Sequence, residues 1–123
     1  MPVKPLEAQV RYLPDLAIID LQGEIDSFAE HVLDAAYSDA ESNQPDTILL
    51  NFSRVEYVNS TGIALIVSLL ARARKSHRRL AAYGLSEHYK EIFRITRLAD
   101  FMNIYPDEAN ALVDVQNSST RTQ

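Results

Sequence analysis

The sequence of 123 residues contains no cysteine and only three glycines. Without cysteine, disulfide bonds, thiolate zinc sites and cysteine nucleophiles are all excluded. The glycines stand at positions 23, 62 and 84, which is not the spacing of a Walker loop or of a dinucleotide-binding loop. The three histidines, His31, His77 and His88, are spread over three predicted helices. We therefore expect neither an enzyme nor a cofactor or metal site.

Long apolar segments are also missing. The longest run, residues 62–71, is about half of the roughly 20 residues that a membrane-spanning helix needs. Residues 1–10 lack the apolar core of a signal peptide. The sequence therefore predicts a cytoplasmic protein that does not insert directly into a membrane.

Basic side chains are in the minority, since 12 lysines and arginines stand against 17 aspartates and glutamates, for a net charge of −5. Nucleic-acid binding depends mainly on neutralising phosphates with basic side chains, so we expect no nucleic-acid partner. The basic residues between Arg72 and Arg79 form one local cluster. We interpret this cluster as the end of a helix, where cations complement the negative end of the helix dipole.

The composition is otherwise that of an ordinary globular protein, with 46% hydrophobic and 24% charged residues. A chain of this length suffices for one core and is too short for two ordinary domains. We expect residues 1–115 to form one domain whose last helix ends near Val115. Residues 116–123 are polar and lack an apolar anchor, so we expect them to be a disordered tail.

Apolar runs bounded by turn residues alternate along the chain with segments of helical periodicity. Strands are expected at residues 8–12, 16–21, 47–52, 80–84 and 102–105, and helices at residues 27–41, from about 62 into the basic cluster, from 86 and from 106. The predicted fold class is α/β, a mixed sheet of four to five strands with about four helices packed mainly on one face. The strand at residues 47–52 is expected at the centre. Strands separated by helices should be parallel.

Several element ends carry recognisable signals. Gly23 is expected to end the second strand. Ser27 and Glu30 have the spacing of a capping box at a helix start. Ser86 is expected to cap the third helix, and Pro106 suits the first position of the last one.

The most informative segment is residues 51–65. The central strand should be followed by a loop containing Val55 and Val58, and then by Asn59, Ser60, Thr61 and Gly62 at a helix start. From the residues alone, Ser60 suits a helix N-cap. Ile63 suits plain core packing, and Asp26 suits a position just before a helix, where its charge complements the N-terminus. Asp26 also forms an acidic cluster with Asp20 and Glu24, but further metal ligands are lacking nearby.

Residues 51–65 resemble the STAS-domain anti-sigma factor antagonists, whose pattern is Asp-Leu-Ser, a short loop, and then Asp-Ser-(Ser/Thr)-Gly-(Leu/Ile). Residues 23–26, Gly-Glu-Ile-Asp, are similar to the family's Gly-Glu-Leu-Asp after the second strand. Residues 92–105 are similar to its C-terminal Leu-Phe, Gly-Leu and Phe-Ile segment. Together, in this order, the fragments cover nearly the whole chain.

The resemblance implies a non-enzymatic, protein-binding switch without a cofactor. Its expected partner is an anti-sigma factor of the histidine-kinase-like ATPase fold that is also a serine kinase, and binding releases a sigma factor. Phosphorylation of the motif serine, Ser60 by position, blocks binding, and a metal-dependent serine phosphatase restores it. The implied partner-binding residues are Asp26, Asn59, Ser60, Thr61, Gly62 and Ile63.

The sequence departs from the family pattern at two positions. Asn59 stands where the family usually has Asp, so the phosphoacceptor lacks a neighbouring negative charge. Arg97 stands where the family often has Gly, which we interpret as a change local to a turn.

Two further functions remain open at this stage. One is a STAS subunit that is never phosphorylated and acts as a constitutive scaffold in a transporter or stress-signalling complex, and Asn59 favours it. The other is a small-molecule sensor or an enzyme, which the lack of a convergent polar cluster disfavours.

Overall fold

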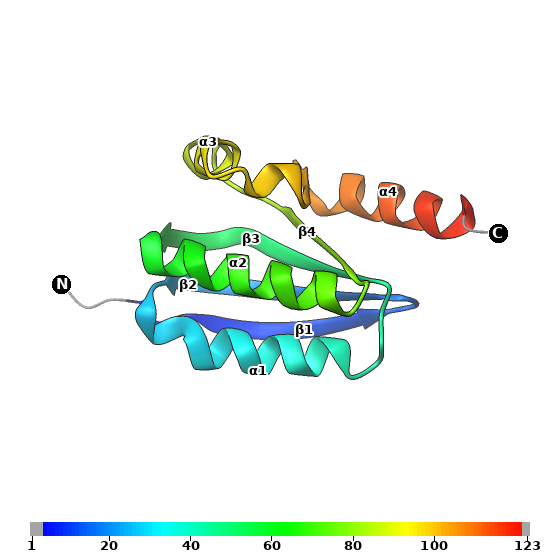
Figure 1. Ribbon diagram of the computed structural model, residues 1–123, viewed down its shortest axis with the longest axis horizontal. Helices are drawn as coiled ribbons and strands as arrows, with labels where there is room; N and C mark the ends of the chain where they lie inside the picture. The colour runs from blue at the N-terminus through cyan, green and yellow to red at the C-terminus, as the bar shows by residue number, and fades with distance from the viewer. Residues whose placement is uncertain (1–3, 122–123) are drawn as a thin grey trace.

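A computed structural model describes residues 4–121, and the side chains of residues 4–117. Its elements in chain order are β1 (Glu7–Leu13), β2 (Leu16–Ile25), the 3-10 helix η1 (Ser27–Ala29), α1 (Glu30–Glu41), β3 (Thr47–Val58), α2 (Ser60–Lys75), β4 (Arg79–Tyr83), α3 (Glu87–Ile95), the 3-10 helix η2 (Leu98–Asp100), β5 (Asn103–Tyr105) and α4 (Glu108–Arg121). Their arrangement is drawn in Figure 1.

The strands form one mixed sheet in the order β1-β2-β3-β4-β5. β1 pairs with β2 in the antiparallel sense, and each following pair is parallel. This confirms the predicted mixed sheet and the central position of the strand that begins at Thr47. Because a parallel pair needs a crossover, every parallel connection here contains a helix.

Helices cover both faces of the sheet, but unequally. α1, α2 and α3 pack on one face, around a large core that includes Ile19, Leu50 and Phe93. α4 packs on the other face through Ala111 and Val115, in a smaller core. In Figure 1, α1 and α2 run side by side along the strands and α4 lies apart from them. The continuous apolar runs of β2 and β3 follow from this arrangement, since both faces of these strands are covered near their N-terminal ends.

Both central parallel strands are longer than the sequence predicted. β2 does not end at Gly23 but continues to Ile25, with register shifts against β3 on either side of Gln22 and Gly23. Gly23 adopts a φ of +108°, and a Cβ there would lie 2.7 Å from the carbonyl oxygen of Pro5. Glycine at this position thus allows the segment before β1 to lie close against β2, and it does not end the strand.

β3 likewise continues to Val58, so the loop expected around Val55 and Val58 does not exist. Val55 pairs with Gly23, and Val58 pairs with Ile25. The longer strands carry the chain directly to the start of α2, with only Asn59 between β3 and that helix.

Several helix ends also differ from the sequence prediction. The side chain of Asp26, not that of Ser27, caps η1 by accepting from the Phe28 N–H, so the predicted capping box is absent. At α4, Asp107 accepts from the Asn110 N–H at 2.9 Å and the helix begins at Glu108, so Pro106 is not its first residue. The Ser86 cap of α3 is confirmed, through its contact with the Tyr89 N–H.

α4 continues to Arg121, although the sequence predicted a helix end near Val115 and a disordered tail beyond it. Residues 116–121 are therefore helical, and residues 122–123 lie outside the described part of the chain. Among residues 4–117, whose side chains are described, Val115 is the last residue of α4 in the smaller core, and the helix continues beyond it. Arg97 adopts a φ of +68°, the left-handed region that favours glycine, in the turn between α3 and η2.

Candidate functional site

The residues singled out in the sequence gather where β2 and β3 end. Ile25 and Val58 are paired as the last residues of the two parallel strands, and Asp26 and Asn59 follow them. The Asn59 N–H donates to the carbonyl oxygen of Ile25 at 3.2 Å. The carboxyl ends of adjacent parallel strands lie at one edge, so two segments far apart in the sequence meet there.

Asn59 is the N-cap of α2. Its Oδ1 accepts a hydrogen bond from the Gly62 N–H at 2.9 Å, and its backbone oxygen accepts from the Ile63 N–H. The interpretation of Ser60 as the N-cap is therefore wrong, because Ser60 is the first residue of the helix. Ser60 and Thr61 are both exposed. The Ser60 side chain is not needed for capping and lies at the positive end of the helix dipole.

Gly62 brings the helix start against the end of β2. A Cβ at this position would lie 2.2 Å from the carbonyl oxygen of Ile25 and 2.9 Å from Cγ1 of Val58. Non-bonded atoms in folded proteins do not approach this closely, so a side chain at this position would force α2 away from the sheet. Gly62 therefore determines how closely Ser60 approaches Asp26.

Ile63 does two things at once. It packs against the large core and also lines a groove of about 300 Å³ between the start of α2 and α3. The groove is lined by Val58, Asn59, Ser60, Ile63, His88, Tyr89, Ile92 and Thr96. The hydroxyl of Tyr89 accepts from the Val58 N–H at 2.9 Å, which ties α3 to the end of β3.

Asp26 is half-buried, and its side chain and backbone accept hydrogen bonds from two residues of the turn that follows. Oδ1 accepts from the Phe28 N–H at 3.0 Å, and the backbone oxygen accepts from the Ala29 N–H at 3.0 Å. The side chain of Phe28 is left 82% exposed by this turn. Sequence reasoning named Asp26 but missed Phe28, because a single aromatic near a helix start is read as a core residue.

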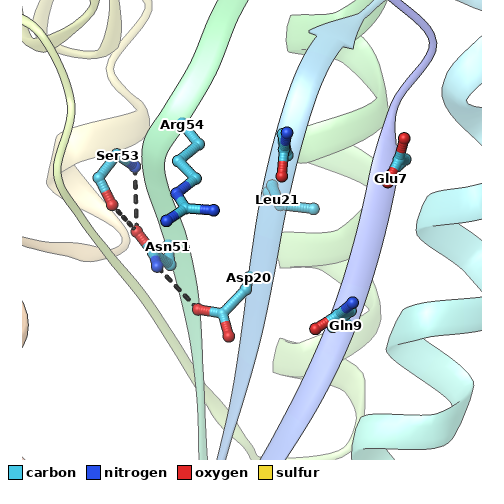
Figure 2. A pocket seen from close by; sticks show the side chains of 8 residues that line it. Glu7, Gln9, Asp20, Leu21, Asn51, Ser53 and Arg54 are labelled. Atoms are coloured by element: carbon cyan, nitrogen blue, oxygen red, sulfur yellow. Dashed lines mark hydrogen bonds between the residues drawn. The ribbon is translucent and has the colours of Figure 1, made fainter.

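A separate polar hollow of about 410 Å³ lies on the face of the sheet that α4 covers in part. Figure 2 shows Asp20, Asn51, Ser53 and Arg54 together in this hollow. Asn51 donates to Asp20 at 2.7 Å and accepts from the Ser53 N–H at 3.0 Å. Within residues 4–121, no group of three or more acidic or histidine side chains is placed to hold a metal ion.

The Asp20 carboxylate is instead held by a cation. Arg11 contacts both carboxylate oxygens of Asp20, at 2.6 and 2.9 Å, and also contacts Glu108 at 2.7 Å. Tyr83 donates to Glu108 at 2.6 Å. The hydrogen bond from Arg11 is the main reason why the pKa of Asp20 and the pKa of Glu108 both lie below their ordinary values. This network ties β1, β2 and β4 to the first turn of α4.

Replacing Arg11 tests how far this network stabilises the fold. At 43% exposure the guanidinium is screened by water, so we expect Arg11→Met to lower the free energy of unfolding at pH 7 by only about 1 kcal/mol. A carboxylate whose pKa is lower in the folded than in the unfolded state stabilises the fold at pH values above its unfolded pKa, which is about 4. This stabilisation is lost as the pH falls through the folded pKa. The difference between wild type and variant in urea unfolding should therefore shrink below about pH 4.

The matched control is Lys90→Met. Its partner Glu87 is 91% exposed and lies one turn away on the same helix. Loss of that pair should change stability by less than about 0.5 kcal/mol at any pH. An Arg11→Met effect that is constant from pH 7 to pH 2.5 would contradict the assignment to paired carboxylates.

The fold is an α/β arrangement in which the N-terminus of α2 lies beside a mainly apolar groove, next to the edge at Asp26 and Asn59. A family model for the STAS domain matches residues 7–111 of the chain. The chain belongs to the STAS domain family.

Individual relatives agree with this assignment. An anti-sigma-B factor antagonist of Staphylococcus aureus is 27% identical over 86 residues, which cover 70% of this chain and 80% of that protein. The crystal structure of an anti-sigma factor antagonist from Mycobacterium paratuberculosis superimposes with a TM-score of 0.78 at 19% identity, covering 90% of this chain and 94% of the other. The Bacillus cell fate determinant SpoIIAA in its phosphorylated form gives 0.68 at 24% identity, over 88% and 98% of the two chains.

No helix within the described residues is both long enough and apolar enough to cross a bilayer.

Proposed function

We propose that this chain is an anti-sigma factor antagonist, a binding module without catalytic activity. In its unphosphorylated form it sequesters an anti-sigma factor of the histidine-kinase-like ATPase fold that is also a serine kinase. Phosphorylation of Ser60 by that kinase ends binding, and a metal-dependent serine phosphatase restores it. All three proteins act in the cytoplasm, and the surface that binds comprises Asp26, Asn59, Ser60, Thr61, Gly62 and Ile63.

The observation that supports the proposal most directly is the placement of Ser60. Ser60 is an exposed residue on the first turn of α2 and is not the cap of this helix. It directly follows Asn59, which lies at the same edge of the sheet as Asp26. A kinase can therefore reach the hydroxyl without opening the fold. The names of the Staphylococcus relatives and the phosphorylated state of SpoIIAA agree with this proposal.

Phosphorylation at this position should leave the domain folded. A phosphoserine carries about −1.5 to −2 charges at pH 7, and negative charge at a helix N-terminus is tolerated or mildly favoured. The capping contact between Asn59 and Gly62 does not involve Ser60, so it survives the modification. The effect of the phosphate then falls on partner binding rather than on stability.

The experiment is a binding assay with a purified histidine-kinase-like anti-sigma factor from the same organism. Unmodified protein should bind, and incubation of the pair with ATP should produce a single phosphate on Ser60 by mass spectrometry, together with release. If the complex persists after incubation with ATP and Ser60 remains unmodified, the switch is rejected and the constitutive scaffold is favoured.

Asn59 offers a test of the phosphorylation step. Asn59→Asp should keep the cap, because aspartate and asparagine cap helices about equally well, so stability should change by no more than about 0.5 kcal/mol. The added carboxylate next to Ser60 should raise the rate of phosphorylation by the cognate kinase. Both quantities are measurable, by thermal unfolding and by the initial rate of phosphate incorporation.

Asn43→Asp is the matched control for added charge. Asn43 is exposed in the turn before β3, at the opposite end of that strand from Ser60. Its substitution should leave the phosphorylation rate unchanged. An Asn59→Asp rate equal to or below that of the wild type would show that asparagine at this position is no handicap.

A further inference from the structure

Phe28 is unusual among the exposed side chains of the described residues. It is 82% exposed, whereas the next most exposed large apolar side chain, Ile95, reaches 61%. A ring exposed to this extent adds little to the core. Single exposed apolar residues are common on protein surfaces, so the exposure of Phe28 is informative only together with its position in the fold.

The backbone that carries Phe28 is held in place. Its N–H donates to the Asp26 carboxylate at 3.0 Å, and the next residue, Ala29, is buried and donates to the Asp26 carbonyl oxygen. Phe28 is thus presented on a short turn that is fixed on both sides. Association through a side chain that is already fixed costs less conformational entropy than association that must order a flexible loop.

The turn that carries Phe28 also lies against the helix that begins at Ser60. η1 packs against α2, and the N–H of Asn59 donates to the residue immediately before Asp26, at 3.2 Å. Two acidic residues flank Phe28 in the sequence, Asp26 before it and Glu30 in the first turn of α1. The surface around this turn thus combines one exposed aromatic ring with carboxylates nearby in the chain.

We propose that Phe28 is the apolar anchor of the interface and inserts into an apolar pocket of the anti-sigma factor that is bordered by basic side chains. This inference rests on the proposed function and adds a contact that the family motif around Ser60 does not contain. Aromatic anchors that fill a partner pocket contribute a large share of binding energy in interfaces. Asp26 is then a positioning residue, because its carboxylate holds the turn that presents the ring.

A second copy of this chain is a less favourable partner for the surface around Phe28. In a two-fold symmetric contact, the same patch meets itself, so Asp26 and Glu30 would approach their own copies. Like charges facing each other across an interface disfavour association. A basic border on a different protein removes this repulsion.

The test compares Phe28→Ala with Val113→Ala in calorimetric titrations of a purified histidine-kinase-like anti-sigma factor. Val113 is 59% exposed on α4 and is a matched control for removing an exposed apolar side chain. Phe28→Ala should weaken binding by about tenfold to a hundredfold, the range expected for burying a phenylalanine ring. Val113→Ala should change the affinity less than twofold, and both variants should keep the wild-type melting temperature.

The outcomes separate this inference from the proposed function. If wild type binds and Ser60→Asp does not, but Phe28→Ala binds as well as wild type, Phe28 is not the anchor of the interface. The proposed phosphorylation switch is then unaffected. If wild type does not bind any such anti-sigma factor, the proposed function fails and the anchor fails with it. A wild-type dimer in sedimentation that Phe28→Ala dissociates would identify a second copy as the occupant and overturn the assignment.

Discussion

Phosphorylated protein and the Ser60→Asp variant are expected to bind the anti-sigma factor about thirty-fold to several thousand-fold more weakly than the unmodified chain. The phosphate would stand on the first turn of α2 beside Ile63, in a surface that must be desolvated when the partner packs against it. Placing an uncompensated charge in such a contact costs about 2–5 kcal/mol, and each 1.4 kcal/mol is tenfold in affinity. Calorimetric titration of the three forms measures the effect.

Two variants control this result. Ser60→Ala removes the acceptor without adding charge or bulk, and since Asn59 is the cap it should keep both stability and affinity. Ser68→Asp adds the same charge at an exposed position further along α2 and should leave binding unchanged. Equal binding by phosphorylated and unmodified protein would reject the switch, and equal loss in Ser68→Asp would mean that net charge alone governs binding.

Gly62→Ala is expected to destabilise the domain by about 2 kcal/mol or more. Alanine is the better helix former by about 1 kcal/mol, which alone would stabilise α2. The new Cβ would lie 2.2 Å from the Ile25 carbonyl oxygen, however, and this atom belongs to the backbone of a central strand and cannot move aside cheaply. Overpacking of this kind costs about 1–3 kcal/mol and sometimes more, and here it also displaces α2. Urea unfolding measures the net change.

Thr61→Ala is the control for Gly62→Ala, since Thr61 is exposed and adjacent on the same turn. It should change the free energy of unfolding by no more than about 0.5 kcal/mol. Partner binding by Gly62→Ala should fall as well, because the start of α2 moves relative to Asp26. A Gly62→Ala variant as stable as the wild type would contradict the close approach of α2 to β2.

Much of the fold could be predicted from local pattern. The apolar runs that begin at Leu16 and Thr47 predicted two buried strands, and both are confirmed at the middle of the sheet. The Ser86 cap and the end of α1 at Glu41 are confirmed as well. These predictions succeed because a run of apolar residues and the cap of a helix both depend on residues that are close together in the chain.

The errors lie where distant segments meet. Gly23 has the local signature of a strand end, but it lies inside β2, where the close approach of the Pro5 carbonyl oxygen leaves no room for a side chain. Ser27 and Ser60 are residue types that commonly cap helices. The caps are instead Asp26 and Asn59, one residue earlier in each case, and the strand before each of them extends further than predicted. Helix α4 continues past Val115, which is its last core residue among the side chains that the structure describes, because a helix can extend beyond the residues that pack.

The sequence by itself determined the α/β class, the central strand and the candidate residues around Ser60, because periodicity and residue type are local properties. Only the tertiary structure decided that Asp26 and Asn59 follow the ends of adjacent parallel strands, that Asn59 rather than Ser60 caps α2, and that Phe28 is exposed on the short helix packed against α2. The physical reason is that strand register and helix approach depend on contacts between residues more than 30 positions apart, such as that between Gly62 and Ile25.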